Sequence, residues 1–135
     1  MLSRNELRGE LTRRRRTYIP GVGTFPVCCI CGKAIIGGGE IHESIITRGM
    51  VRSIEKAYLI LVPENSNLLH TACHPESGRG SAEDFLKCAN DLYLYEGDRV
   101  LEWLDRIEAE IPTIVNQVRR EFLLQIEIPS SFSFR

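Results

Sequence analysis

Two pairs of residues with metal-binding side chains stand out in this sequence. Cys28 and Cys31 form a CxxC pair, and Gly32 behind them lets the chain curl tightly because glycine carries no Cβ. His70 and Cys73 repeat the same spacing further along the chain. Three thiolates and one imidazole suit tetrahedral zinc, and four protein ligands leave no position open for water. The sequence therefore predicts a structural Zn²⁺ site made by Cys28, Cys31, His70 and Cys73.

The chain contains 5 cysteines, so two of them lie outside these pairs. An odd number of clustered cysteines argues against a disulfide framework and favours metal binding in a reducing compartment. Cys29 is too close to Cys31 to form the usual pair, so we expect a small buried residue or a solvent-facing thiol. Cys88 has apolar neighbours in a predicted helix, and we expect it in the core.

Polar residues suited to phosphodiester hydrolysis lie between and beside the two pairs. His42 and Glu43 stand in a strand-like segment, and His74 directly follows the second pair. Asn65 precedes that pair, with Asn67 as its nearby competitor. Hydrolysis of a phosphodiester needs a cation that stabilises charge and a base tuned near neutral pH. Histidine meets the second need without tuning, whereas glutamate needs a raised pKa or a metal-bound water.

The order of these motifs resembles the HNH endonuclease family, in the phage-type form that carries an added zinc. The resemblance covers residues 27–75 and rests on the CxxC pair, the histidine-bearing strand and the run NSNLLHTACH from Asn65 to His74. It implies a ββα-metal fold, a catalytic divalent cation (Mg²⁺ or Mn²⁺) and hydrolysis of phosphodiester bonds in DNA. It also implies that Asn65 fixes the hairpin and helps to orient the base, and that His74 binds the catalytic cation.

The first motif departs from the family pattern, in which a metal-ligating Asp or His precedes the histidine base. In one register His42 is the ligand and Glu43 stands at the position of the base. In the other register His42 is the base and Ile41 stands at the ligand position, where it cannot bind metal. Neighbouring strand residues point to opposite faces, so we expect only one of the pair to face the cation. The sequence favours His42 as the essential residue and leaves its role open. A zinc-binding module with a degenerate site, which binds nucleic acid or protein without cleavage, is the alternative.

Positive charge is concentrated near the start of the chain, although the formal net charge of the whole protein is -1. A basic start on a near-neutral body is typical of a phosphate-binding arm, and also of a solvated tail. With DNA as the partner, we expect contacts mostly to the phosphate backbone, with strong salt dependence and modest sequence preference. The candidate phosphate contacts are Arg13, Arg14, Arg15, Arg16, Arg48 and Arg52.

The elements that must position these residues predict an α+β fold. A short helix is predicted over residues 3–16, and Pro20-Gly-Val-Gly should break regular structure after it. A glycine turn at 37–39 precedes strands expected over 40–46 and 58–62. The expected parts are a basic N-terminal arm, a small zinc-stapled ββα-metal module, a helical extension and a tail, over residues 1–26, 27–80, 81–128 and 129–135.

The helical extension repeats apolar residues at helical spacing. Ser81 and Asp84 form a capping-box-like start to a helix that runs to about residue 93. Two further helices are predicted over 98–111 and 114–122. They carry no chemical motif, so we expect them to pack on the zinc module or on a second copy, which leaves a homodimer open. No apolar run approaches the roughly 18 residues that a membrane span needs, and no signal peptide is recognisable. We therefore expect a cytoplasmic protein without membrane contact, and the resemblance adds an origin in a phage or mobile element.

Overall fold

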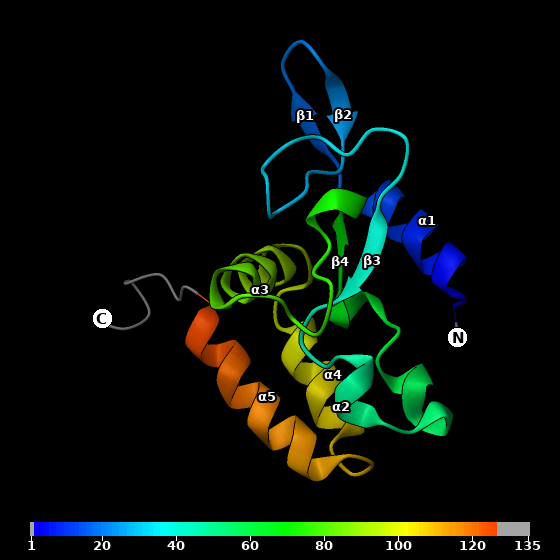
Figure 1. Ribbon diagram of the computed structural model, residues 1–135, viewed down its shortest axis with the longest axis vertical. Coiled ribbons are helices and arrows are strands. Elements are labelled where there is room, and N and C mark those ends of the chain that lie inside the picture. The colour runs from blue at the N-terminus through cyan, green and yellow to red at the C-terminus, as the bar shows by residue number, and fades with distance from the viewer. Residues whose placement is uncertain (1, 127–135) are drawn as a thin grey trace.

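The computed structural model describes residues 2–126, and its α+β fold agrees with the class expected from the sequence (Figure 1). The strands form two antiparallel pairs, β1 with β2 and β3 with β4. The strands are β1 (Thr17–Ile19), β2 (Gly23–Phe25), β3 (Glu40–Glu43) and β4 (Ser66–Leu69). The α-helices are α1 (Arg4–Arg14), α2 (Arg48–Val51), α3 (Ala82–Glu96), α4 (Arg99–Ile107) and α5 (Pro112–Gln125). Short 3-10 helices cover Ile54–Leu59, Pro63–Asn65 and Thr71–Cys73.

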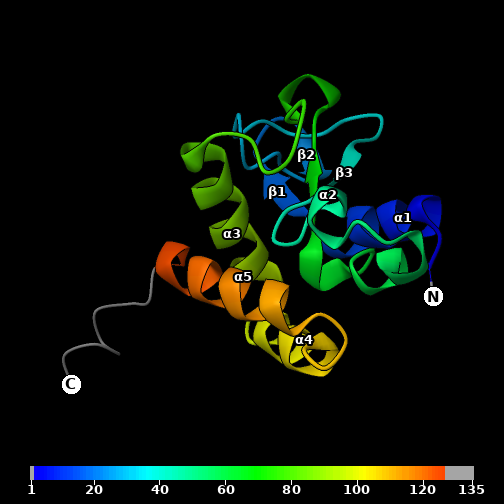
Figure 2. The same cartoon turned by 60° about the horizontal axis from the view of Figure 1, so that its bottom comes forward.

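The β3–β4 pair lies between α1 on one side and α3 on the other (Figures 1 and 2). Its register places His42 opposite Asn67. Leu7 and Leu11 of α1 are fully buried and share one apolar cluster with Ile41 of β3. The helix that the sequence predicts at the start of the chain is therefore packed on the sheet, and one of its long faces is part of the core.

A buried ion pair joins the end of α1 to α3. Arg15 and Glu96 are each 4% exposed, and Nη2 of Arg15 lies 2.8 Å from Oε2 of Glu96. The same guanidinium donates to the backbone oxygens of Pro63 and Ser66. Nη2 of Arg14 lies 3.1 Å from the same carboxylate oxygen. These contacts connect α1, the segment before β4 and α3 at a single point.

The segment after α1 is more regular than the sequence predicts. Pro20-Gly was expected to break regular structure, but it makes the turn of the β1–β2 hairpin, where the N–H of Val22 donates to the Ile19 carbonyl at 3.0 Å. Gly21 has a φ of 79°, which only glycine adopts without strain. The breaker residues therefore close a hairpin, which stands out from the rest of the molecule (Figure 1).

The strand expected over residues 58–62 is wrong. This segment begins inside the 3-10 helix Ile54–Leu59, and Nε1 of Trp103 donates to the carbonyl of Leu59 at 3.0 Å. The partner of β3 is β4, which contains Ser66 and Asn67 but is buried along its whole length. Polar side chains in a buried strand hide it from a hydrophobicity pattern. The strand expected over 40–46 ends at Glu43, and the N–H groups of Ile45 and Ile46 bond to the side chain of Asn65 instead of to a strand.

The three C-terminal helices are confirmed, with small shifts at their ends. Ser81 caps α3, and Oγ of Ser81 accepts from the N–H of Asp84 at 3.0 Å. Pro112 begins α5. The helices enclose the larger apolar core around Leu92, Trp103 and Phe122. Between residues 2 and 126, no helix has the length and apolar character needed to cross a membrane. The tail expected over 129–135 lies outside the described residues.

Candidate metal centre and histidine cleft

Two tight backbone turns present the predicted metal ligands. In the first turn, the N–H of Gly32 donates to the carbonyl of Cys28 at 2.7 Å, and Gly32 has a φ of 76°. The N–H of Cys28 donates to the carbonyl of Lys33 at 3.0 Å, which closes the loop. In the second turn, the N–H of Cys73 donates to the carbonyl of His70 at 2.9 Å. Each pair of ligands is thus held on one side of a short loop.

The four side chains converge as the spacing predicts. The donor atoms of Cys28, Cys31, His70 and Cys73 all lie within 4.8 Å of one another. Ligands at about 2.0–2.3 Å from one tetrahedral ion are separated by roughly 3.3–3.8 Å, so a small closing movement would bring them onto an ion. Nε2 of His70 lies 2.9 Å from the carbonyl of Ala34 and must donate to it, which leaves the lone pair on Nδ1. That Nδ1 lies 3.2 Å from Sγ of Cys31. The cluster can hold a structural metal ion.

The acidities of the clustered thiols depend on their neighbours. A hydrogen bond from the backbone of Lys33 lowers the pKa of Cys31. Burial, together with the thiols of Cys28 and Cys31, raises the pKa of Cys73 to about 11. Three neighbouring thiols resist ionising together unless a cation balances their negative charge, and a coordinated metal would supply that positive charge. Metal binding at this cluster would therefore favour the ionised form of the three thiols.

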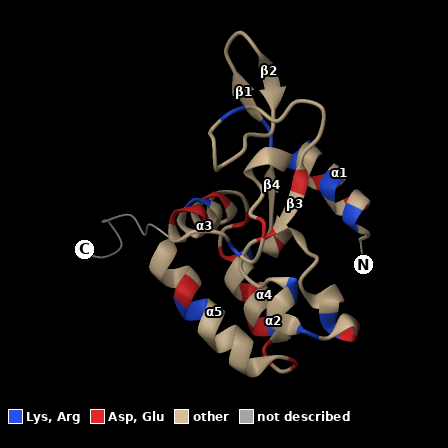
Figure 3. Cartoon of the chain, viewed as in Figure 1, with Lys and Arg blue, Asp and Glu red and all other residues tan. Residues whose placement is uncertain are grey.

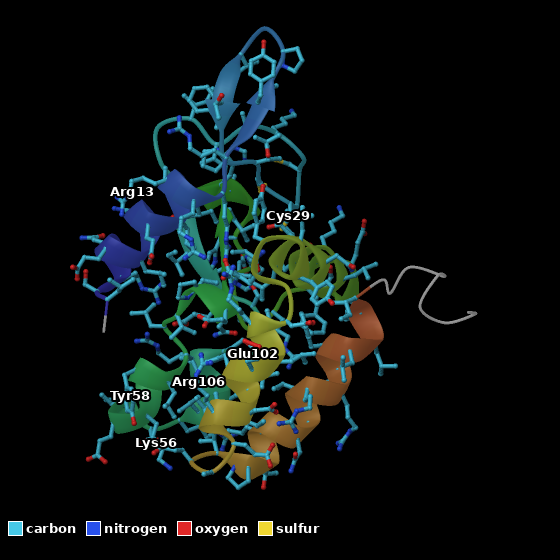
Figure 4. The ribbon with its side chains drawn as sticks, turned by 180° about the vertical axis from the view of Figure 1, so that it is seen from behind. Arg13, Cys29, Lys56, Tyr58, Glu102 and Arg106 are labelled. Atoms are coloured by element: carbon cyan, nitrogen blue, oxygen red, sulfur yellow. The ribbon has the colours of Figure 1, made fainter. Side chains whose placement is uncertain are left out.

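The two remaining cysteines lie beside the cluster and are not part of it. Sγ of Cys29 lies 3.7 Å from Sγ of Cys88, which is fully buried as the sequence predicts. The hydrogen bond with Cys88, and then burial, raise the pKa of Cys29. Cys29 is half-buried on the loop next to α3, between the two environments expected for it (Figure 4). The side chain of Cys29 contacts Cys88, so it does not join the cluster to which its sequence neighbours Cys28 and Cys31 belong.

The two other histidines meet at a separate cleft. The ring centroids of His42 and His74 are 5.1 Å apart, with an angle of 80° between the planes. Nε2 of His74 lies 3.2 Å from the carbonyl of Ile41, and Nδ1 lies 2.8 Å from the carbonyl of Pro75. These contacts hold His74 against β3. The cleft has a volume of about 590 Å³ and is lined by α1, β3, the start of α2 and residues 74–78.

His42 is the deeper member of the histidine pair. It is 2% exposed, and its Nε2 is buried without a hydrogen-bond partner among the described residues. Burial and the charge of His74 lower the pKa of His42 to about 4, against an opposing effect of Asp84. The imidazole is therefore neutral near pH 7. A buried ring nitrogen without a partner is costly unless another group satisfies it, which points to a ligand or a water at this position.

Glu43 takes a different direction from His42. Its carboxylate lies 3.4 Å from Nη2 of Arg4 on α1 and 3.4 Å from Nη2 of Arg48 on α2. The sequence left open which residue of the pair meets His74, and the structure places His42 there. Both residues of the pair line the same cleft. The imidazoles and the arginine-bound carboxylate therefore form two neighbouring groups of opposite chemical character.

Asn65 holds the loop that follows β3. It is fully buried, and its Oδ1 accepts from the N–H groups of Ile45 and Ile46 at 2.9 Å each. Its Nδ2 donates to the carbonyls of Ile46 and Ile60 at 2.9 Å each. Asn67 belongs to another network, in which its Nδ2 donates to the carbonyl of Cys88 and to Asp91. Both asparagines contact the segment after β3: Asn65 binds the backbone of Ile45 and Ile46, and Oδ1 of Asn67 accepts from the hydroxyl of Ser44.

Replacing Asn65 by alanine is expected to lower the free energy of unfolding by about 2–5 kcal/mol. Two buried backbone N–H groups and two buried carbonyls would then lose their hydrogen-bond partner. Urea denaturation measures this loss. Asn116 is exposed on α5, and replacing it by alanine is the matched control, with a change expected within about 0.5 kcal/mol. Equal effects of the two substitutions would contradict the structural role of Asn65.

The predicted phosphate contacts do not behave as one group. Arg15 is buried in its ion pair with Glu96, so its assignment as a phosphate contact is wrong. Arg13 and Arg16 are exposed, and Arg14 is half-exposed beside Glu96. Arg48 lines the cleft, whereas Arg52 borders a shallow cavity next to α5. Figure 3 shows the mixture of basic and acidic residues along α1.

Two arginines that line the cleft, Arg4 and Arg8 of α1, are not among the residues predicted from the sequence. Arg4 contacts Glu43 directly. The spacing of four residues between Arg4 and Arg8 places them on one helical face, and this spacing was the available signal. No pattern in the sequence indicates that this face of α1 packs beside β3.

The chain was compared with family models, curated proteins and solved structures, and nothing in any of the three comparisons matches it. Its chemistry must therefore be argued from its own two sites. One is a compact thiol–imidazole cluster and the other is an open cleft with a histidine pair and arginines. The first has the character of a structural centre, and the second has the space for a substrate.

Proposed function

We propose that this protein is a metal-dependent DNA endonuclease of the HNH type. The observation that carries the proposal is the histidine pair in a cleft bordered by arginines. The ring of buried His42 packs against that of His74, and Nε2 of His42 has no hydrogen-bond partner within residues 2–126. A buried imidazole with a perturbed pKa in an open cleft, such as His42, is typical of acid–base or metal chemistry. Arginines in the same cleft add affinity for a phosphate.

The thiol–imidazole cluster is proposed to bind zinc in a structural role. Its four donors and the hydrogen bond from His70 to Ala34 agree with the ligand types and second-shell contacts of closed zinc sites. The two turns that carry the ligands flank β3 and β4 in the sequence. Zinc would therefore fix the end of the β3–β4 pair next to the cleft without taking part in the reaction.

The cleft residues fit a second, exchangeable divalent cation. His42 offers a ring nitrogen that has no partner among the described residues, and Glu43 offers a carboxylate in the same cleft. Both ring nitrogens of His74 contact backbone carbonyls, so His74 would have to release one of these contacts to join the ligand set. This small mixed set leaves room for water and substrate and suits Mn²⁺ or Mg²⁺. When bound, the cation would stabilise the charge that develops on the phosphate.

The residues of the chain have separate tasks in this proposal. His42 is neutral near pH 7, so its ring nitrogen could hold the cation, whereas a pKa of about 4 makes it a weak acceptor for a proton from the attacking water. Asn65 keeps the loop after β3 in place, and His74 closes the other side of the cleft. Arg4 and Arg48 bind Glu43 and are placed to exchange this carboxylate for a phosphate of DNA.

A second candidate is a binding module without nuclease activity. The ion pairs of Glu43 with Arg4 and Arg48 favour it, since a carboxylate paired with two arginines is a poor base. In that case the cleft would bind DNA phosphates without hydrolysis. The two candidates differ only in cleavage, so a single assay separates them.

Purified protein is expected to nick supercoiled plasmid when Mn²⁺ or Mg²⁺ is added. His42→Ala and His74→Ala should reduce the rate by about 100-fold to 10,000-fold, the range for loss of an acid–base group. Gel electrophoresis of the relaxed plasmid measures the rate. Arg106→Ala removes a surface contact with Glu64 and is the matched control, with an unchanged rate expected. Equal nicking by all four proteins would indicate contamination, and binding without nicking by wild type would leave the second candidate.

A further inference from the structure

The cleft and a second, smaller cavity lie along the same side of α1. Arg4 and Arg8 line the cleft, and Thr12 and Arg16 line a cavity of about 190 Å³. Residues four positions apart share one face of an α-helix, so Arg4, Arg8 and Thr12 form a row. Arg16 continues it just beyond the end of the helix. The row connects the two cavities.

The acidic residues of α1 do not interrupt this row. Glu6 accepts from the backbone N–H of Ser3 at the helix start, and Glu10 lies 3.6 Å from Arg14. Their positions place them on the other side of the helix from Arg4 and Arg8. The residues of α1 and its end that border the cavities are three arginines, Asn5 and Thr12, and none of them is acidic.

The smaller cavity has an accessible backbone on its far side. It is bordered by Gly37, Gly38 and Gly39. Gly37 and Gly38 have φ values of 85° and 106°, and a Cβ at either position would meet no atom within 4 Å. No side chain thus shields this part of the backbone. An open glycine backbone facing Thr12 and Arg16 can receive a phosphate at close range.

We propose that this face of α1 guides one DNA strand from the histidine cleft to the glycine cavity. The inference rests on the proposed function, because it takes the cleft as the place where DNA is bound. Thr12 lies eight residues after Arg4 in α1, which is about 12 Å at a helical rise of 1.5 Å per residue, and Arg16 lies beyond the end of the helix. Each strand of a duplex carries one charge per 3.4 Å of helix axis, so about 12 Å corresponds to three or four phosphates. Several consecutive phosphates would thus follow the row.

This path separates arginines that the sequence places together. Arg16 belongs to it, while Arg13 projects from the outer side of α1 (Figure 4). Nη1 of Arg13 lies 3.4 Å from the position of a Cβ on Gly9, away from the row. Arg8 and Arg13 are thus two exposed arginines of one helix, of which only Arg8 is expected to meet DNA.

The experiment measures binding to a short DNA duplex by fluorescence anisotropy over a range of KCl concentrations. Neither a divalent cation nor a chelator is added, so cleavage is not needed and the thiol–imidazole cluster keeps its metal. Arg8→Ala and Arg16→Ala are each expected to reduce the slope of log affinity against log salt by about 1. Arg13→Ala, the matched control, should leave the slope unchanged. Thermal unfolding midpoints equal to that of wild type show that each variant folds.

The outcome is independent of the nicking assay. A smaller slope for Arg8→Ala and Arg16→Ala alone supports the path even where wild type does not nick plasmid, which would overturn only the nuclease proposal. The path is overturned when Arg13→Ala lowers the slope as much as the other two. It is also overturned when wild type does not bind duplex, or when neither Arg8→Ala nor Arg16→Ala changes the slope.

Discussion

Replacing Cys31 by serine is expected to remove bound zinc and to lower the thermal unfolding midpoint by more than about 10 °C. Serine cannot supply the thiolate, and the other three ligands would then lie close together without a closed coordination sphere. Elemental analysis of the purified protein and a thermal scan measure the two effects. The larger helical core contains none of the four ligands, so much of the helical circular dichroism should survive.

Cys29→Ala is the matched control for this experiment. Cys29 lies between two ligands in the sequence, yet its sulfur faces Cys88. The variant should therefore keep stoichiometric zinc and lose far less thermal stability than Cys31→Ser. A wild-type protein that is folded, zinc-free and as stable as the zinc-loaded form would contradict the structural role of the metal.

Replacing Glu96 by glutamine is expected to lower the free energy of unfolding by about 3–5 kcal/mol, the range for breaking one partner of a buried ion pair. The carboxylate of Glu96 is the buried counter-charge of Arg15, and glutamine would leave that guanidinium without it. Urea denaturation gives the difference. Glu83→Gln on the same helix removes the exposed pair with Lys87 and should cost less than about 1 kcal/mol. Similar losses in both variants would show that burial adds nothing to the Glu96 pair.

The pH dependence gives an independent measurement of the same ion pair. Burial raises the pKa of Glu96, but the hydrogen bond and charge of Arg15, with the charges of Arg14 and Arg99, outweigh it and hold the pKa below its usual value. A carboxyl group with a lowered pKa stabilises the folded state above the unfolded value, about 4.3, and this contribution is lost as the pH falls through the folded pKa. Wild type should therefore lose more stability on acidification than Glu96→Gln.

The metal ligands could be predicted from the sequence because each pair forms within one short turn. A CxxC or HxxC spacing nearly fixes the local geometry, so only the meeting of the two turns required the fold. The capping box at Ser81 could be predicted for the same reason, since its hydrogen bonds join residues three positions apart. Interactions between residues a few positions apart can be predicted without knowledge of the tertiary structure.

The parts that could not be predicted depend on contacts between distant segments. β4 contains Ser66 and Asn67, both buried. Arg15 donates to the carbonyl of Ser66, and Asn67 donates to Asp91 of α3, which an alternation pattern does not reveal. Arg15 sits in a run of four arginines, yet it alone is buried, because Glu96 lies opposite it in the fold. Arg4 and Arg8 lie at the cleft because Leu7 and Leu11 pack α1 on the β3–β4 pair. The apolar periodicity of one helix shows which face is buried, but it does not show which part of the molecule that face packs against.

The packing of α1 on the β3–β4 pair limits how far the chain can be dissected. A fragment of residues 27–80 would contain the cleft pair of His42 and His74 and all four metal ligands. It would lack the side chains of Leu7 and Leu11, which share an apolar cluster with Ile41 and Leu69. It would also lose the wall of the cleft formed by Arg4 and Arg8. Residues 27–80 are therefore not expected to keep their structure when they are separated from α1. Truncated or grafted versions of this segment should include α1.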